Sequence, residues 1–175
     1  MMMEVEVKTA CVDPDGLRQK VLAMGGIFRG RYQQSDEYYA HPCRDFAVTD
    51  EALRIRSQPG LVQMHYKGPK IDQSTKTREE LGIFLPDSEA MSAILDRLGF
   101  RPVMTVRKDR EVYLLKEIEI CLDRVEGLDT YVELETSGDD LDDARRRLLD
   151  LMAELGLEGS ERRSYLELLM EAQDA

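Results

Sequence analysis

The chain contains little cysteine, and its three cysteines, Cys11, Cys43 and Cys121, lie far apart in the sequence. An odd number at these spacings forms neither a zinc-binding motif nor a disulfide framework, which is typical of a protein in the reducing cytoplasm. Long apolar runs are also missing, since none approaches the roughly 20 residues that span a membrane. The opening Met1-Met2-Met3-Glu4 is neither a basic leader nor an apolar core. We therefore expect no membrane span, no signal peptide and an untethered start.

Positive charge is scarce, with 24 Lys and Arg against 35 Asp and Glu, a formal net charge of −11 over 175 residues. This balance excludes broad nucleic-acid binding, because a phosphate backbone requires a basic face. It does not exclude a local cationic site, since salt screens charges beyond roughly 8 Å. The hydrophobic share of 42% and charged share of 34% are typical of a folded chain. We expect a single domain over residues 1–175.

Alternating hydrophobicity over most of the chain is typical of strands. We expect strands over residues 4–12, 27–40, 53–57, 61–67, 77–85, 103–115, 117–123 and 131–136. We expect helices over residues 14–24, 86–98, 141–155 and 160–170, the last capped by Ser160. Because the strands mostly follow one another through turns, the pattern indicates an α+β fold with an antiparallel sheet that can close into a barrel.

A polar loop opens at Gly68-Pro69 and runs through Lys76. Such a loop, with no regular structure of its own, is often mobile or ligand-binding. The apolar stripe of residues 141–155 predicts a helix that covers the barrel or forms a dimer surface.

Ionisable residues recur at alternate positions of several strands. Glu4, Glu6 and Lys8 share one face of their strand, while Val5 and Val7 take the other. The same spacing occurs in Arg54/Arg56, Arg78/Glu80, Lys108/Arg110 and Glu133/Glu135. One interpretation is an antiparallel sheet with one wet face. The other is a closed barrel with a charged interior, whose apolar outer face is covered by the helices.

A charged interior would imply a ligand, because burying so many charges without compensation is costly. Carboxylates suit hard divalent cations such as Mg²⁺. Arginine and lysine suit phosphate oxygens. The ligand that this composition indicates is a metal-bound polyphosphate or nucleoside triphosphate.

The opening strand Glu4-Val5-Glu6-Val7-Lys8 has the form ExExK, and further charged segments follow it in a definite order. These are Leu53-Arg54-Ile55-Arg56, Tyr66-Lys67-Gly68-Pro69, Thr77-Arg78-Glu79-Glu80, Val106-Arg107-Lys108-Asp109-Arg110, Cys121-Leu122-Asp123-Arg124-Val125 and Tyr131-Val132-Glu133-Leu134-Glu135. Over nearly the whole chain this order resembles the CYTH superfamily, also called triphosphate tunnel metalloenzymes. The resemblance implies a closed antiparallel eight-stranded β-barrel, a tunnel, with helices packed on its outside.

Two more segments resemble one branch of that superfamily, the class IV adenylyl cyclases of the CyaB type. They are residues 36–42 with Arg44-Asp45-Phe46, and residues 163–169. One departure is Asp129, where many relatives have glycine, so the local turn or substrate edge is expected to differ.

The resemblance assigns roles to the charged residues. Carboxylates would hold one or two Mg²⁺ or Mn²⁺ ions: Glu4, Glu6, Asp123, Glu133 and Glu135. Basic residues would bind the triphosphate: Lys8, Arg54, Arg56, Lys67, Arg78, Lys108 and Arg110. The catalytic set would be Glu4, Glu6, Lys8, Arg54 and Arg56. Glu80 is a weaker candidate that would orient a neighbouring arginine.

The implied activity is conversion of ATP to 3′,5′-cyclic AMP and pyrophosphate. The alternatives are metal-dependent hydrolysis of inorganic triphosphate, thiamine triphosphate or a nucleotide, and a non-catalytic polyphosphate or nucleotide sensor. The complete acidic set argues against the sensor, since a pure anion binder has little need of carboxylates. The resemblance also implies a homodimer.

Overall fold

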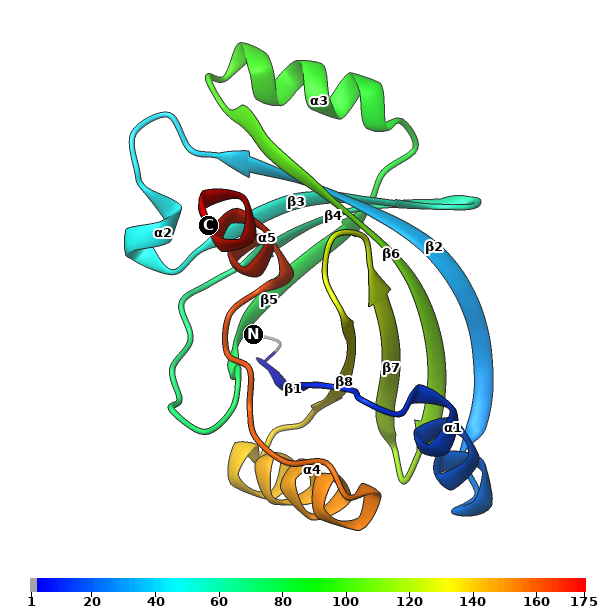
Figure 1. Cartoon of the computed structure of the whole chain (residues 1–175). Helices are drawn as coiled ribbons and strands as arrows, with labels where there is room; N and C mark the ends of the chain where they lie inside the picture. The colour runs from blue at the N-terminus through cyan, green and yellow to red at the C-terminus, as the bar shows by residue number, and fades with distance from the viewer. Residues whose placement is uncertain (1–2) are drawn as a thin grey trace.

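The computed structural model describes residues 3–175. Of the predicted untethered start Met1-Met2-Met3, the first two residues lie outside the described residues, whereas Met3 begins β1 and pairs with Glu79. Eight antiparallel strands form a closed barrel in the order β1-β5-β4-β3-β2-β6-β7-β8 (Figure 1). Their bounds are β1 (Met3–Ala10), β2 (Ile27–Ala40), β3 (Ala52–Gln58), β4 (Leu61–Lys67), β5 (Arg78–Phe84), β6 (Arg101–Leu115), β7 (Ile118–Val125) and β8 (Thr130–Ser137). The predicted α+β barrel with external helices is confirmed, and the single wet-faced sheet is wrong.

In the described part of the chain, five helices accompany the barrel: α1 (Pro14–Ala23), α2 (Phe46–Thr49), α3 (Ser88–Arg97), α4 (Leu141–Leu155) and α5 (Tyr165–Asp174). Figure 1 places α1 and α4 near one end of the barrel and α3 near the other. The single turn of α2 was not predicted, because four residues are too few to show a helical period. No helix among residues 3–175 is long and apolar enough to cross a membrane.

The start of the last helix differs from the sequence prediction. Ser160 does not cap it, and α5 begins after Ser164, whose hydroxyl accepts from the backbone N–H of Glu167. The Glu167 carboxylate in turn accepts from the Ser164 N–H and completes a capping box. Ser160 has Arg163 three residues later, so it cannot form that reciprocal pair.

The largest of three buried apolar clusters lies between the outside of the barrel and the helices α1 and α4. Val5 and Val7, on the outer face of β1, belong to one buried cluster with Leu148 of α4. The cluster also takes in Leu17 and Val21 of α1. The apolar stripe of α4 therefore covers the barrel, which was one of the two roles predicted for this helix. Because the outer valines are packed in this way, Glu4, Glu6 and Lys8 must face the interior.

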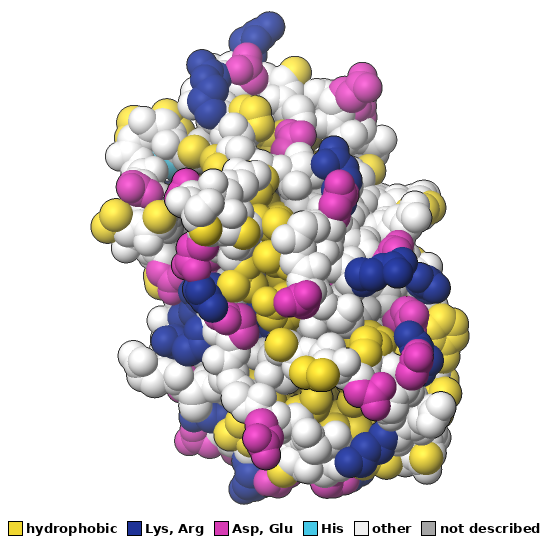
Figure 2. All heavy atoms as spheres, in the orientation of Figure 1, with side chains coloured by type: hydrophobic (Ala, Val, Ile, Leu, Met, Phe, Trp, Pro, Cys, Tyr) yellow, Lys and Arg dark blue, Asp and Glu magenta, His cyan; other side chains and the backbone are white. Residues whose placement is uncertain are grey.

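Helix α3 covers less of the barrel than its sequence predicts. Of its expected apolar stripe, Leu95 is buried, but the exposed fractions of Ile94 and Leu98 are 51% and 64%. Figure 1 shows why, because α3 stands at the rim of the barrel rather than along its wall. The space-filling view also shows apolar side chains at the surface, interspersed with charged ones (Figure 2).

We predict that the α4 contact stabilises the barrel directly. Leu148 is fully buried, so Leu148→Ala should lower the free energy of unfolding by about 2–5 kcal/mol, from lost burial and the cavity left behind. Leu149, its neighbour on the same helix, is 42% exposed, and Leu149→Ala serves as the matched control. Urea unfolding measures both variants, and equal losses would contradict this packing.

Candidate active site

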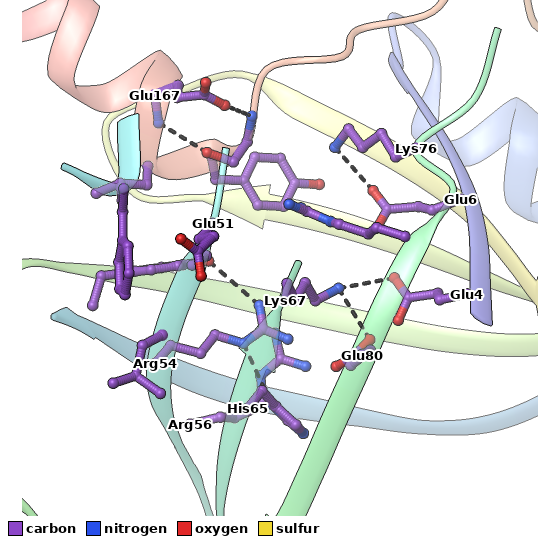
Figure 3. A pocket seen from close by; sticks show the side chains of 18 of the residues that line it. Glu4, Glu6, Glu51, Arg54, Arg56, His65, Lys67, Lys76, Glu80 and Glu167 are labelled. Carbon is purple, nitrogen blue, oxygen red and sulfur yellow. Dashed lines mark hydrogen bonds and ion pairs between the residues drawn. The ribbon is translucent and has the colours of Figure 1, made fainter. Parts of the chain in front are cut away.

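The inward side chains of the barrel line one large cavity of about 1170 Å³. This volume exceeds the roughly 300–1,000 Å³ of ordinary small-molecule pockets. Its wall is charged, and the close-up in Figure 3 shows acidic and basic side chains from different strands pointing toward one another. Every predicted metal or triphosphate residue except Asp123 lines the cavity: Glu4, Glu6, Lys8, Arg54, Arg56, Lys67, Arg78, Lys108, Arg110, Glu133 and Glu135.

Three of the predicted metal-binding carboxylates form a compact group. Glu4, Glu6 and Glu135 each offer an oxygen, and these oxygens lie within 4.8 Å of one another. Strand register produces this proximity, because Glu6 of β1 pairs with Glu135 of β8. Burial, together with the neighbouring carboxylates Glu4 and Glu6, raises the pKa of Glu135 to about 8. This largely buried all-oxygen group fits a hard divalent cation such as Mg²⁺ or Mn²⁺.

The other two predicted carboxylates lie in an ion-pair network. Arg110 donates to both oxygens of Asp123, at 2.7 and 2.5 Å, and to Glu133 at 2.7 Å. Asp123 also accepts a hydrogen bond of 2.8 Å from the Tyr165 hydroxyl. The structure thus separates the five acids into a group of three and a pair held by Arg110. In these contacts, Asp123 and Glu133 orient the Arg110 side chain.

A buried aspartate organises the opposite wall. Arg56 donates to both oxygens of Asp36, at 2.7 and 2.8 Å, and Arg54 contacts the same carboxylate at 3.4 Å. The Lys108 ammonium lies 3.9 Å from it. Burial alone would raise the pKa of Asp36, but Arg54 and Arg56 outweigh it and hold that pKa well below the ordinary value. Asp36 therefore orients both predicted triphosphate-binding arginines of β3 and lies near Lys108 of β6.

Two lysines contact the acidic group itself. The Lys67 ammonium donates to Glu4 at 2.8 Å and lies 3.2 Å from Glu80. The Lys76 ammonium donates to Glu6 at 3.0 Å. Glu80 contacts a lysine in this structure, whereas its predicted partner was an arginine.

The segment that leads into α5 also reaches this cavity. Lys8 donates its side-chain N–H to the backbone carbonyl of Arg163 and lies 4.2 Å from the centroid of the Tyr165 ring. Lys108 lies 4.9 Å from the same ring. Burial and the nearby ammonium of Lys76 lower the pKa of Lys8 to about 7. The first turn of α5 therefore contributes an aromatic wall to the site.

Sequence reasoning did not assign Asp36, Lys76 or Tyr165 to the site. A signal existed for two of them. Asp36 alternates with Gln34 and Tyr38 along its strand, and Lys76 stands two residues before Arg78, so period-two alternation places each on the inner face. Nothing in the local pattern around Tyr165 indicates its contact with Asp123, which joins residues far apart in the chain.

His65 also faces the cavity, where its Nδ1 accepts from the Arg54 side chain at 3.3 Å. Burial and the charges of Arg54 and Arg56 lower the pKa of His65 to about 3, from an ordinary 6.5. An unfolded chain would bind a proton here below about pH 6.5, whereas the folded protein would not. Stability therefore falls as pH falls from about 6.5 toward 3.

We predict that His65→Gln removes this part of the acid sensitivity. The variant should gain on the order of 1 kcal/mol relative to the unmodified protein at pH 5, and nothing at pH 7.5. Urea unfolding at both pH values, in the absence of divalent metal, measures the difference. The same gain at both pH values would show that protonation of His65 is not the cause.

Comparisons with known proteins agree with this geometry. A family model described as CYTH domain matches residues 2–165. A relative from Methanocaldococcus jannaschii, "Putative adenylate cyclase MJ0240", is 40% identical over 172 residues, covering 95% of this chain and 98% of that protein. "Adenylate cyclase CyaB" from Aeromonas hydrophila is 30% identical over 173 residues, covering 94% of this chain and 87% of that protein.

A solved structure is similar to this chain as well. The solved structure of the PH1819 protein from Pyrococcus horikoshii OT3 superposes with a TM-score of 0.88 at 45% identity, covering 96% of this chain and 98% of that one. The resemblance seen in the order of the charged strands is thereby confirmed, and the chain belongs to the CYTH family.

Proposed function

We propose that this protein is a metal-dependent adenylyl cyclase that converts ATP to 3′,5′-cyclic AMP and pyrophosphate. The observation that carries the proposal is the barrel cavity in which the oxygen group of Glu4, Glu6 and Glu135 faces a wall of arginines and lysines. An anion of high charge that brings its own divalent cation is the ligand that compensates both walls. The names of the two cyclase relatives support a nucleotide as that anion.

The reaction is an internal substitution at phosphorus. The ribose 3′-oxygen forms a bond to the α-phosphorus and its proton passes to solvent water, while the bond from the α-phosphorus to the bridging oxygen breaks and pyrophosphate leaves. Glu4, Glu6 and Glu135 would hold Mg²⁺ or Mn²⁺, which would lower the pKa of the attacking hydroxyl and neutralise phosphate charge.

The cations would stabilise the charge that builds up on pyrophosphate. Arg54 and Arg56 project into the cavity, and Asp36 holds them in place. Each close cation–phosphate pair is worth up to about 4 kcal/mol at an effective dielectric constant near 20, before desolvation. Because these groups are oriented before the substrate arrives, little reorganisation is needed as charge develops.

We predict that the purified protein makes cyclic AMP and pyrophosphate from ATP with Mg²⁺ or Mn²⁺. Arg56→Met should lower turnover by roughly 10²-fold, because it removes a fixed cation from the departing group. Arg146→Met is the control, since Arg146 lies on α4 with its side chain 70% exposed. Inorganic triphosphate and thiamine triphosphate are tested in parallel.

The products separate the alternatives. Orthophosphate without cyclic AMP would replace the cyclase by a triphosphatase that delivers water to the terminal phosphorus. Saturable binding without any product would leave a sensor. In either case the proposed cyclase activity would be wrong.

A further inference from the structure

A second hollow adjoins the main cavity, and the proposed reaction does not use it. It measures about 810 Å³ and lies where β6 turns into β7 and Arg147 of α4 approaches the barrel. The main cavity instead extends toward α2 and α5, which Figure 1 shows well away from α4. The two hollows are continuous, because they share wall residues: Glu4, Gln63, His65, Glu80, Leu114, Glu119 and Glu135.

The second hollow is acidic. One arginine, Arg147, lines it together with five carboxylates: Glu4, Glu80, Glu117, Glu119 and Glu135. Arg147 lies 3.8 Å from Glu117 and 3.9 Å from Asp143, so its charge is divided between two of its acidic neighbours. Basic and acidic side chains line the main cavity in nearly equal number. The two ends of the bore therefore differ in charge.

Strand register places three carboxylates in one row across the wall. Glu119 of β7 pairs with Glu135 of β8, and Glu135 pairs in turn with Glu6 of β1. Like charges directly opposite one another destabilise a sheet. Among the described residues, an ion pair offsets this row only at Glu6, through Lys76. Glu119 accepts a hydrogen bond of 3.6 Å from the Cys121 thiol, which is a weak donor.

Glu119 connects solvent with the oxygen group of the proposed site. It is exposed, and it lines both hollows. Its register partner Glu135 belongs to the oxygen group, which fits a divalent cation. Directly opposite residues of antiparallel strands have Cβ atoms about 4.5–5.5 Å apart. A cation that meets Glu119 at the surface is therefore one side chain away from the oxygen group.

Charge of one sign at an entrance acts on the rate at which ions arrive. A cleft lined by one sign of charge raises the local concentration of its counter-ions and their association rates, by roughly 10–10³-fold. The acidic end attracts a divalent cation and repels a polyphosphate, whose charge has the opposite sign. A metal ion that uses this end does not compete with a bulky anion that enters between α2 and α5.

We propose that the acidic end of the barrel is the entrance for the divalent cation, and that Glu119 captures the ion before it reaches the oxygen group. Sequence reasoning did not assign Glu119 to the site. The inference rests on the proposed function only in requiring that the oxygen group binds a metal ion, so it holds for a cyclase or a triphosphatase.

The test measures both rates of Mn²⁺ exchange in the full-length protein without nucleotide. Electron paramagnetic resonance gives the dissociation constant, and transfer of bound Mn²⁺ to a fluorescent chelator in stopped flow gives the release rate. The association rate is the release rate divided by the dissociation constant. Glu119→Gln keeps the size of the side chain and removes its charge, so association should slow roughly fivefold at low salt, while release changes by less than about twofold. Glu119→Lys should slow association further, by roughly tenfold or more.

The opposite end of the same strand offers a matched control. Glu126 is exposed and directly follows β7 at the turn into β8, so Glu126→Gln removes the same charge far from the acidic end. Both rates should stay unchanged in this variant. In about 1 M KCl, where the screening length is roughly 3 Å, Glu119→Gln and the unmodified protein should bind Mn²⁺ at the same rate.

Each outcome decides the proposal. Unchanged rates in Glu119→Gln, or equal slowing in Glu126→Gln, would show that the ion does not enter at this end. A change confined to the release rate would make Glu119 an ordinary ligand, which also overturns the proposal. Slower association without any cyclic AMP formation from ATP would refute the cyclase and leave the entrance standing. No Mn²⁺ binding by the unmodified protein would refute both.

Discussion

Compensation of buried charge inside the barrel is the constraint on which the rest of the structure depends. A buried ion that loses its partner is destabilising by several kcal/mol, so an inward acid is stabilised by a cation on a neighbouring strand. The strands satisfy this through register: Asp36 meets Arg56, and Asp123 meets Arg110. A slip of one residue in any strand would turn its charges toward the apolar cover and its valines toward the bore. The same pairing that specifies the fold therefore assembles the site.

Much of this arrangement could be predicted from alternation along the strands. Side chains at every second position share a face, so Glu4, Glu6 and Lys8 were expected to point one way and their neighbouring valines the other. The apolar stripe of α4 indicated where the outward valines would pack, because a helix with one apolar face needs an apolar surface to cover. These patterns left both a wet-faced sheet and a covered barrel open, and the order of the charged segments indicated the barrel through its resemblance to the CYTH superfamily.

The remaining features depend on which inward side chains contact one another. The pattern of residue types along the sequence does not specify these partners. Period-two spacing places Glu133 and Glu135 on the same face, but it does not say that one joins Arg110 while the other joins Glu4 and Glu6. The two-residue spacing of Lys76 from Arg78 indicates the inner face, but it does not indicate that Lys76 meets Glu6. The exposure of Ile94 and Leu98 likewise depends on where α3 stands, which its own stripe does not determine.

The contacts between the two ends of the chain have a consequence for biosynthesis. Strand β1 pairs with β8, and the backbone N–H of Glu161 donates to the carbonyl of Lys8, while Tyr165 closes over Lys8 and Lys108. Residues 155 positions apart in the sequence thus meet in one wall of the site. That wall forms only when β1 and the segment leading into α5 have both been synthesised and have folded together.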